Sequence, residues 1–146
     1  MLQALQLIAT LAATLFAGAA LYINVAEHPS RMALETRTAA LQWAPSYKRA
    51  TLLQAPLAML SFLSGTAVWF LGETVGWFVA ALFVGAVVPF TLIVVMPTNR
   101  KLLDPARDLA SAETRALLEK WNILHGVRTA LSLTASITYL WLLAGA

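Results

Sequence analysis

Both histidines of the chain stand at helical spacing from other polar side chains, and they are the residues best suited to chemistry. Asn24 precedes His28 by four residues, so a helix presents the two side chains on one face. His125 follows Trp121 by four residues and precedes Arg128 by three, which again places them on one face. Imidazole can accept a proton near neutral pH or bind a transition metal. The two clusters are therefore candidates for a catalytic base or a metal site.

Three further polar residues are expected at the same depth as these clusters. Glu27 adjoins His28, Tyr47 precedes the second long apolar stretch, and Asn99 follows the third. Any one of them could merely cap a helix or reach the interface, because helix ends leave backbone groups unpaired. Helical bundles, however, build their sites from facing positions. We therefore predict that the side chains form one polar pocket.

Four long apolar stretches must position these residues. They cover about residues 2–25, 51–71, 75–96 and 127–144. Each can cross a hydrocarbon core of about 30 Å as a helix, which takes roughly 20 residues. The first lacks a basic start and a cleavage signal, so we expect it to be retained rather than removed as a signal peptide. The sequence predicts an all-α fold, a single four-transmembrane-helix bundle over residues 1–146.

Composition agrees with a membrane protein and excludes several functions. The chain is 60% hydrophobic and 12% charged, whereas soluble domains carry about 25% charged residues. It has no cysteine, which excludes disulfides, thiol catalysis and cysteine-bound metals. No acid or base is expected in the middle of a span, which argues against an ion carrier. The net charge of +3 is explained by membrane topology and not by nucleic acid.

The basic residues predict the orientation in the membrane. All ten fall in or beside two connections, as Arg31, Arg37, Lys48 and Arg49 in one and Arg100, Lys101, Arg107, Arg115, Lys120 and Arg128 in the other. The turn between the second and third spans carries only Glu73. By the positive-inside rule, connections 27–50 and 97–126 are cytoplasmic and both termini are extracytoplasmic. We expect this arrangement in a bacterial inner membrane.

Both cytoplasmic connections are expected to contain a short amphipathic helix. Asp104 and Pro105 have the pattern of an N-cap followed by proline in the first turn, and this helix could continue through Trp121 into the fourth span. The first connection has a comparable stretch over residues 30–43, which Pro45 should end.

Three segments resemble those of a known family. They are NVAEHP at 24–29, PFTLIVVMPTNRKL at 89–102 and WNILHGVR at 121–128. Together they are similar to the small four-helix membrane family that includes the anthrone oxygenases of polyketide pathways. The resemblance covers essentially the whole chain, and its specific parts are the last two segments.

The resemblance implies a monooxygenase that uses O₂ on a small apolar aromatic or phenolic, anthrone-like substrate. Anthrones have an acidic methylene group whose carbanion can react with O₂ directly, so the enzyme needs a base and donors to an anionic oxygen. His125 is the first candidate base and His28 the second, and Arg128, counted as catalytic, Asn99 or Tyr47 could donate to the anionic oxygen. The expected substrate-binding residues are Asn24, Tyr47, Asn99 and Trp121.

Two alternatives remain open at this point. His28 and His125, with Glu27 or Asn24, could hold a single transition metal, whereas a haem between the histidines is less favoured. The chain could instead be a non-catalytic membrane subunit or a small-ligand binder whose polar layer only caps the bundle. The expected partners are the lipid bilayer and a small apolar aromatic molecule, not nucleic acid. A homo-oligomer stays open.

Overall fold

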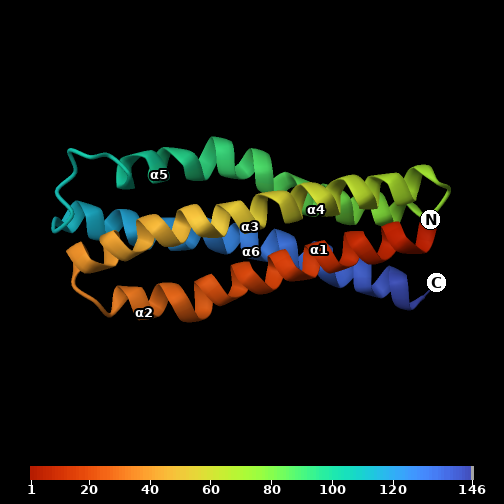
Figure 1. The fold of residues 1–146 in the computed structure, drawn as a ribbon, viewed down its shortest axis with the longest axis horizontal. Helices are drawn as coiled ribbons and strands as arrows, with labels where there is room; N and C mark the ends of the chain where they lie inside the picture. Colours follow the sequence, from red (N-terminus) through yellow and green to blue (C-terminus); the bar gives the residue numbers. More distant parts are fainter. Residues whose placement is uncertain (146) are drawn as a thin grey trace.

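The structure, a computed structural model, describes residues 1–145 and contains only helices and their connections over that range. Four of its helices are long and apolar enough to cross a membrane, and they lie side by side (Figure 1). They cover Leu2–Met32, Thr36–Phe70, Val75–Leu102 and Ala112–Ala144. The predicted four-helix bundle is confirmed, and the chain is an integral membrane protein. Ala146, the last residue of the expected domain, lies outside the described residues.

Two of the four long helices contain a single π-helical turn. The first consists of α1 (Leu2–Tyr22), the π turn η1 (Ile23–Glu27) and α2 (His28–Met32), and the third of α4 (Val75–Phe90), η2 (Thr91–Val95) and α5 (Met96–Leu102). The second is α3 (Thr36–Phe70) and the fourth is α6 (Ala112–Ala144).

A proline follows each π turn and accounts for it. Pro29 and Pro97 have no N–H and crowd the carbonyl of the preceding turn. The N–H of His28 bonds to the carbonyl of Ile23, and that of Met96 to the carbonyl of Thr91, each five residues back. Such π turns bend a helix and often occur at functional sites. Here they lie near the same end of the bundle.

The bundle is held together by small side chains between closely packed helices. α1 and α4 each pack against both α3 and α6, so they occupy diagonal corners. Ala9, Ala13, Ala80 and Ala81 are fully buried, and they form one core cluster with aromatic residues such as Tyr139. Within lipid there is little hydrophobic gain from burying apolar surface, so close backbone approach at small residues supplies much of the helix association.

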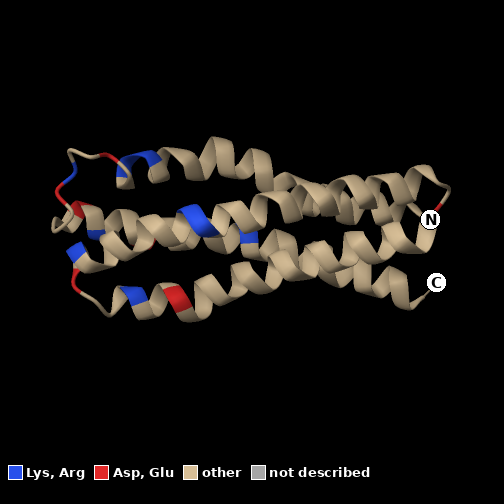
Figure 2. Cartoon of the chain, in the orientation of Figure 1, with Lys and Arg blue, Asp and Glu red and all other residues tan. Residues whose placement is uncertain are grey.

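The charged residues gather at one end of the bundle, as the sequence predicts. Figure 2 shows the basic residues at and near the end that carries the α2–α3 and α5–α6 connections. The opposite end holds both termini and the turn after α3, where Gly72 adopts a φ of 99° that favours glycine (Figure 1). Two charged residues lie elsewhere: Glu73 is in the turn at the opposite end, and Arg128 stands at the middle of α6.

The expected helices within the connections are not separate elements in the described residues. Pro45 does not end a helix, because α3 runs through it from Thr36 to Phe70. Burial of Trp43, Ala39 and Ala40 on the same helix offsets the backbone bond lost at the proline. The first connection is thus a short turn over residues 33–35, and the stretch expected over 30–43 is divided between α2 and α3.

The second connection also differs from the expectation. Asp104 accepts a hydrogen bond from the N–H of Ala106 at 2.9 Å, so it closes a turn and does not begin a helix. The true N-cap is Ser111, whose hydroxyl accepts from the N–H of Thr114 at 3.1 Å. From there α6 continues through Trp121 into the fourth span, as predicted.

Candidate functional site

Asn24 on η1 fixes the orientation and the protonation of His125 on α6. The Asn24 amide nitrogen donates to the backbone carbonyl of Asn122 at 3.0 Å and to its side-chain oxygen at 2.8 Å. The other carboxamide atom of Asn24 is therefore the oxygen, and it lies 2.9 Å from Nδ1 of His125. Because an oxygen acceptor requires a donor, the neutral imidazole carries its proton on Nδ1. Nε2 of His125 is then left with a free lone pair.

Arg128, one turn further along α6, is a buried cation. It is only 8% exposed, and one terminal N–H donates to the side-chain oxygen of Gln54 on α3 at 2.9 Å. Its guanidinium also lies 5.6 Å from the ring centre of Phe16. Among residues 1–145, no carboxylate lies within 4.0 Å of it. A buried charge without a counter-charge is costly and usually marks a functional site.

Three aromatic side chains and both histidines form a continuous cluster of rings beside Arg128. Trp121 lies between the imidazoles, with ring centres 5.4 Å from His28 and 4.8 Å from His125. Trp43 packs edge-on against Trp121 and is itself stacked on Tyr47 at 5.1 Å. The structure thus brings together residues from η1, α2, α3 and α6 that lie far apart in the sequence.

A narrow cavity next to these rings is lined by several residues that carry buried hydrogen-bond donors without a partner. It has a volume of about 10 Å³, enough for about one water molecule, and His125 and Tyr47 are among the residues that line it. Four other lining residues present buried N–H groups with no acceptor among the described residues, namely Trp43, Gln54, Trp121 and Arg128. Buried donors normally find a partner. This excess of donors suits a ligand oxygen, above all an anionic one.

A larger apolar cavity adjoins the narrow one. Its volume is about 150 Å³, and a cavity of that size accommodates a small aromatic ring. Tyr47, Thr51 and Arg128 line both cavities, so they stand at the boundary between them. The remaining lining is almost entirely aliphatic or aromatic. The arrangement can hold an apolar molecule with its polar group turned toward Arg128 and His125.

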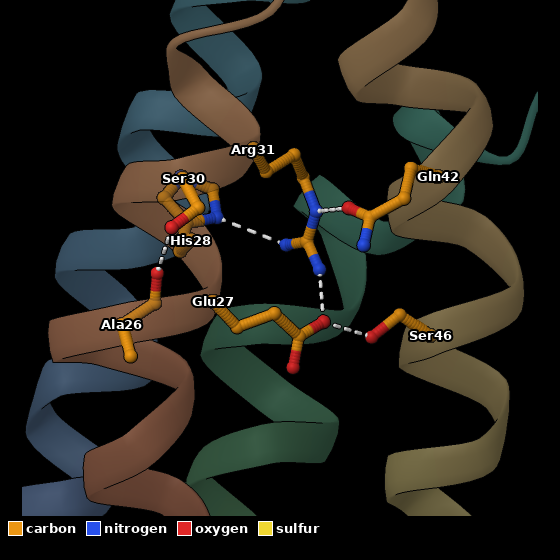
Figure 3. A network of polar contacts seen from close by, with 7 residues as sticks. All are labelled: Ala26, Glu27, His28, Ser30, Arg31, Gln42 and Ser46. Atoms are coloured by element: carbon orange, nitrogen blue, oxygen red, sulfur yellow. Dashed lines mark hydrogen bonds and ion pairs between the residues drawn. The ribbon is translucent and has the colours of Figure 1, made fainter.

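Glu27 and Arg31 form a second polar network, which Figure 3 shows in detail, and Arg31 also lines the narrow cavity. Arg31 is an ion-pair partner of Glu27, donates to the side chain of Gln42, and lies 3.1 Å from Nδ1 of His28. Ser46 on α3 donates to the same oxygen of Glu27. The network ties α2 to α3 at the charged end of the bundle.

The same network bears on whether Glu27, His28 and His125 could together bind a metal ion. A guanidinium already lies between His28 and Glu27, two of the three candidate ligands. The third, His125, keeps Nε2 free because its Nδ1 donates to Asn24, so the set fails at the carboxylate, which Arg31 and Ser46 already occupy. In the part of the chain that the structure describes, no three His, Asp or Glu side chains are grouped as metal ligands. These residues do not fit a two-histidine, one-carboxylate metal centre.

The sequence predictions for individual site residues have different outcomes. The narrow cavity is lined by His125, Arg128, Tyr47 and Trp121. Asn24 does not line it but accepts a hydrogen bond from His125. Asn99 is fully buried on α5 but lines neither cavity, and its carboxamide has no hydrogen-bond partner among residues 1–145.

Several residues of the site were not predicted from the sequence. The side chains at the centre of the site also contact Gln54, Asn122, Thr129 and Arg31. The sequence contains a pattern that could have identified Arg31, because it follows Glu27 by four residues and His28 by three and so shares a helix face with both. Gln54 had a weaker one, as a glutamine within an apolar span.

Fold and site together define a small four-helix membrane protein with a buried, donor-rich site beside an apolar cavity. The family model described as anthrone oxygenase matches residues 43–138, about two thirds of the chain. The chain belongs to this family. The match includes Tyr47, His125 and Arg128, whereas Asn24 and His28 precede it. No curated protein and no solved structure matches the chain significantly.

Proposed function

We propose that this protein is a membrane-embedded monooxygenase that uses O₂ to oxidise a small apolar aromatic or phenolic, anthrone-like substrate. One observation carries the proposal: four of the residues that line a cavity together with His125 carry buried N–H donors without acceptors among the described residues. Such a site stabilises an oxyanion next to a base. Membership of the anthrone oxygenase family supports the same chemistry.

In the first step, His125 removes a proton from the substrate. Nε2 is the available base, because the hydrogen bond from Nδ1 to Asn24 fixes the tautomer. In an anthrone this proton comes from the methylene group, and the electron pair moves into the ring system to give an enolate. Arg128 and the neighbouring N–H donors stabilise the enolate oxygen, which lowers the barrier to deprotonation.

The second step is the reaction of the electron-rich carbon with O₂. A carbon–oxygen bond forms, and the terminal peroxide oxygen takes back the proton held by His125. Loss of the second hydrogen from that carbon and of hydroxide, which leave together as water, breaks the O–O bond and gives a ketone. The overall balance is anthrone plus O₂ to anthraquinone plus water. The substrate supplies all the electrons.

The apolar cavity supports this assignment of substrate class. Its lining would bury a flat hydrocarbon framework, while Arg128 and Tyr47 at its inner boundary would meet a single oxygen. O₂ is more soluble in hydrocarbon than in water, so a site within the bilayer is well supplied. We also propose that the charged end of the bundle is cytoplasmic, as the positive-inside rule favours, in a bacterial inner membrane.

Oxygen uptake by the purified protein in lipid nanodiscs tests the proposal. With anthrone as substrate, we expect uptake of one O₂ for each anthraquinone formed, above the rate of empty nanodiscs. Ile123→Ala is a suitable control variant, because Ile123 lies on α6 but is 71% exposed. Binding of anthrone without added oxygen uptake would instead favour a small-ligand binder, and no binding would favour a structural subunit.

A further inference from the structure

Exposed residues of α3 and η2 are among those that line the larger cavity. Its floor is made of buried residues, with Phe16 at 1%, Val87 at 2% and Arg128 at 8% exposure. Its rim contains exposed residues, with Ala55 on α3 and Leu92 on η2, the latter 60% exposed. The lining of the cavity therefore includes buried residues around Arg128 and exposed residues on α3 and η2. This is the arrangement expected of a passage that leads from Arg128 to the surface between the two helices.

The π turn explains why the helices separate at this point. α3 packs against α4 over the adjoining part of the bundle, whereas η2 packs against α6. Pro89 and Pro97 flank η2 and remove two backbone N–H groups from this helix. Prolines and π turns are the usual causes of a bend in a helix. The bend leaves the side of the bundle open between α3 and η2.

The opening lies at a depth that lipid tails occupy. Ala55 is 15 residues from the end of α3 at Phe70, and Leu92 is 17 residues from the start of α4 at Val75. At 1.5 Å per residue both stand roughly 25 Å from the turn at Gly72, within a hydrocarbon core of about 30 Å. The rim therefore faces the bilayer and not the aqueous phase.

We infer that the substrate reaches the site sideways from the bilayer, through the gap between α3 and η2. The inference rests on the proposed function for the chemistry at the inner end. The passage takes a planar apolar molecule with one acidic oxygen, a phenol or an enolisable ketone. Its wall excludes molecules with several charges, because Arg128 is the one charged residue that lines it within residues 1–145. The cation at its inner end selects the oxygen that enters first.

The absence of cysteine from the chain allows a direct test. In Leu92→Cys, benzyl methanethiosulfonate should attach a benzyl group at the rim by a disulfide, which dithiothreitol removes. Ile93→Cys is the matched control, because Ile93 is the next residue of η2, is 73% exposed, and does not line the cavity. Both variants in nanodiscs are assayed for anthrone oxidation and for binding of 1-hydroxyanthraquinone, measured by quenching of tryptophan fluorescence.

We expect the benzyl group on Leu92→Cys to slow both binding and turnover at least tenfold, with recovery in dithiothreitol, and to change neither in Ile93→Cys. Equal effects on the two variants, or none on Leu92→Cys, would overturn the lateral route even if turnover proves the oxygenase. A selective block of binding in a protein that oxidises no anthrone would keep the route and refute the proposed function. If the probe does not bind the unmodified protein, for instance because a lipid chain fills the cavity, the inference is wrong.

Discussion

Asn24 and His125 lie 101 residues apart in the chain and are joined by a hydrogen bond of 2.9 Å. The same Asn24 oxygen also accepts from the hydroxyl of Thr129. Asn24 is thus held on both sides, by Asn122 at its nitrogen and by two donors at its oxygen. A rigid acceptor of this kind selects one tautomer of the imidazole, as the proposed base requires.

Replacing Asn24 by Ala should lower kcat at least tenfold and leave KM nearly unchanged. Asn24 does not line either cavity, so its loss affects the tautomer and position of His125 and not substrate binding. A tenfold loss corresponds to about 1.4 kcal/mol of transition-state stabilisation. The measurement is steady-state oxidation of anthrone in nanodiscs.

Asn122→Ala is the control for Asn24→Ala. It removes one acceptor of the Asn24 amide but keeps the backbone carbonyl at 3.0 Å, so kcat should fall much less. A change in KM alone in Asn24→Ala would show that Asn24 contacts substrate, contrary to its placement behind His125.

Arg128→Met should raise the thermal stability of the protein while it abolishes turnover. The guanidinium is buried with no carboxylate nearby in residues 1–145, so an apolar side chain of similar length removes a desolvation cost. Arg31→Met is the contrasting variant, because it leaves Glu27 and Gln42 without their partner and should lower the stability. Melting temperatures in detergent decide the matter. A lower melting temperature for Arg128→Met would mean that Arg128 is structural.

The spans and the grouping of charge could be predicted because they depend on local composition. An apolar run of about 20 residues forms a helix in lipid whatever its neighbours are. The prediction that Pro45 ends a helix was wrong, because the burial of Trp43 and of the alanines of α3 outweighs the one backbone hydrogen bond that the proline removes. The N-cap at Ser111 was missed for a related reason, since the pattern at Asp104 also satisfies a turn.

The contacts of the site depend on how each helix is rotated about its axis. Helical spacing predicts that His125 and Arg128 share a face, but not that this face meets Asn24 and Gln54. The sequence allowed both histidines to bind a metal together with Glu27, yet Glu27 is paired with Arg31, which also lies beside Nδ1 of His28. Pairings between helices require the packing of the whole bundle, which one sequence does not reveal.

Gly65→Ala should destabilise the bundle by about 1–3 kcal/mol, the usual cost of overpacking a core. A Cβ atom at Gly65 would lie 1.9 Å from the hydroxyl oxygen of the buried Tyr139, so α3 and α6 would have to separate. Gly18→Ala is the control, because nothing lies within 4 Å of its added Cβ atom. Thermal unfolding of both variants in detergent checks the packing. A melting temperature for Gly65→Ala equal to that of Gly18→Ala would contradict it.

The proposed orientation can be tested with two single-cysteine variants. Glu73→Cys lies in the turn between α3 and α4, and Asp104→Cys lies in the α5–α6 connection. A membrane-impermeant maleimide should label Glu73→Cys on intact cells and Asp104→Cys only after the membrane is opened. The reverse pattern would place the basic end outside and refute the positive-inside assignment.

Nε2 of His125 is the proposed base, and His125→Asn removes that atom alone from the hydrogen-bonded arrangement. The asparagine amide nitrogen takes the place of Nδ1 and can still donate to Asn24, so little stability should be lost. The variant has no group in the place of Nε2 that can accept a proton. General base catalysis typically contributes 10²–10⁴-fold to a rate.

Anthrone-dependent oxygen uptake per folded molecule should therefore be measured for His125→Asn and for the unaltered protein in the same nanodiscs, with folding verified by thermal unfolding. If Nε2 is the base, oxygen uptake falls by at least about 100-fold while the melting temperature stays almost unchanged. Turnover by folded His125→Asn within about twofold of the unaltered protein would contradict it, because the expected loss for a base is far larger.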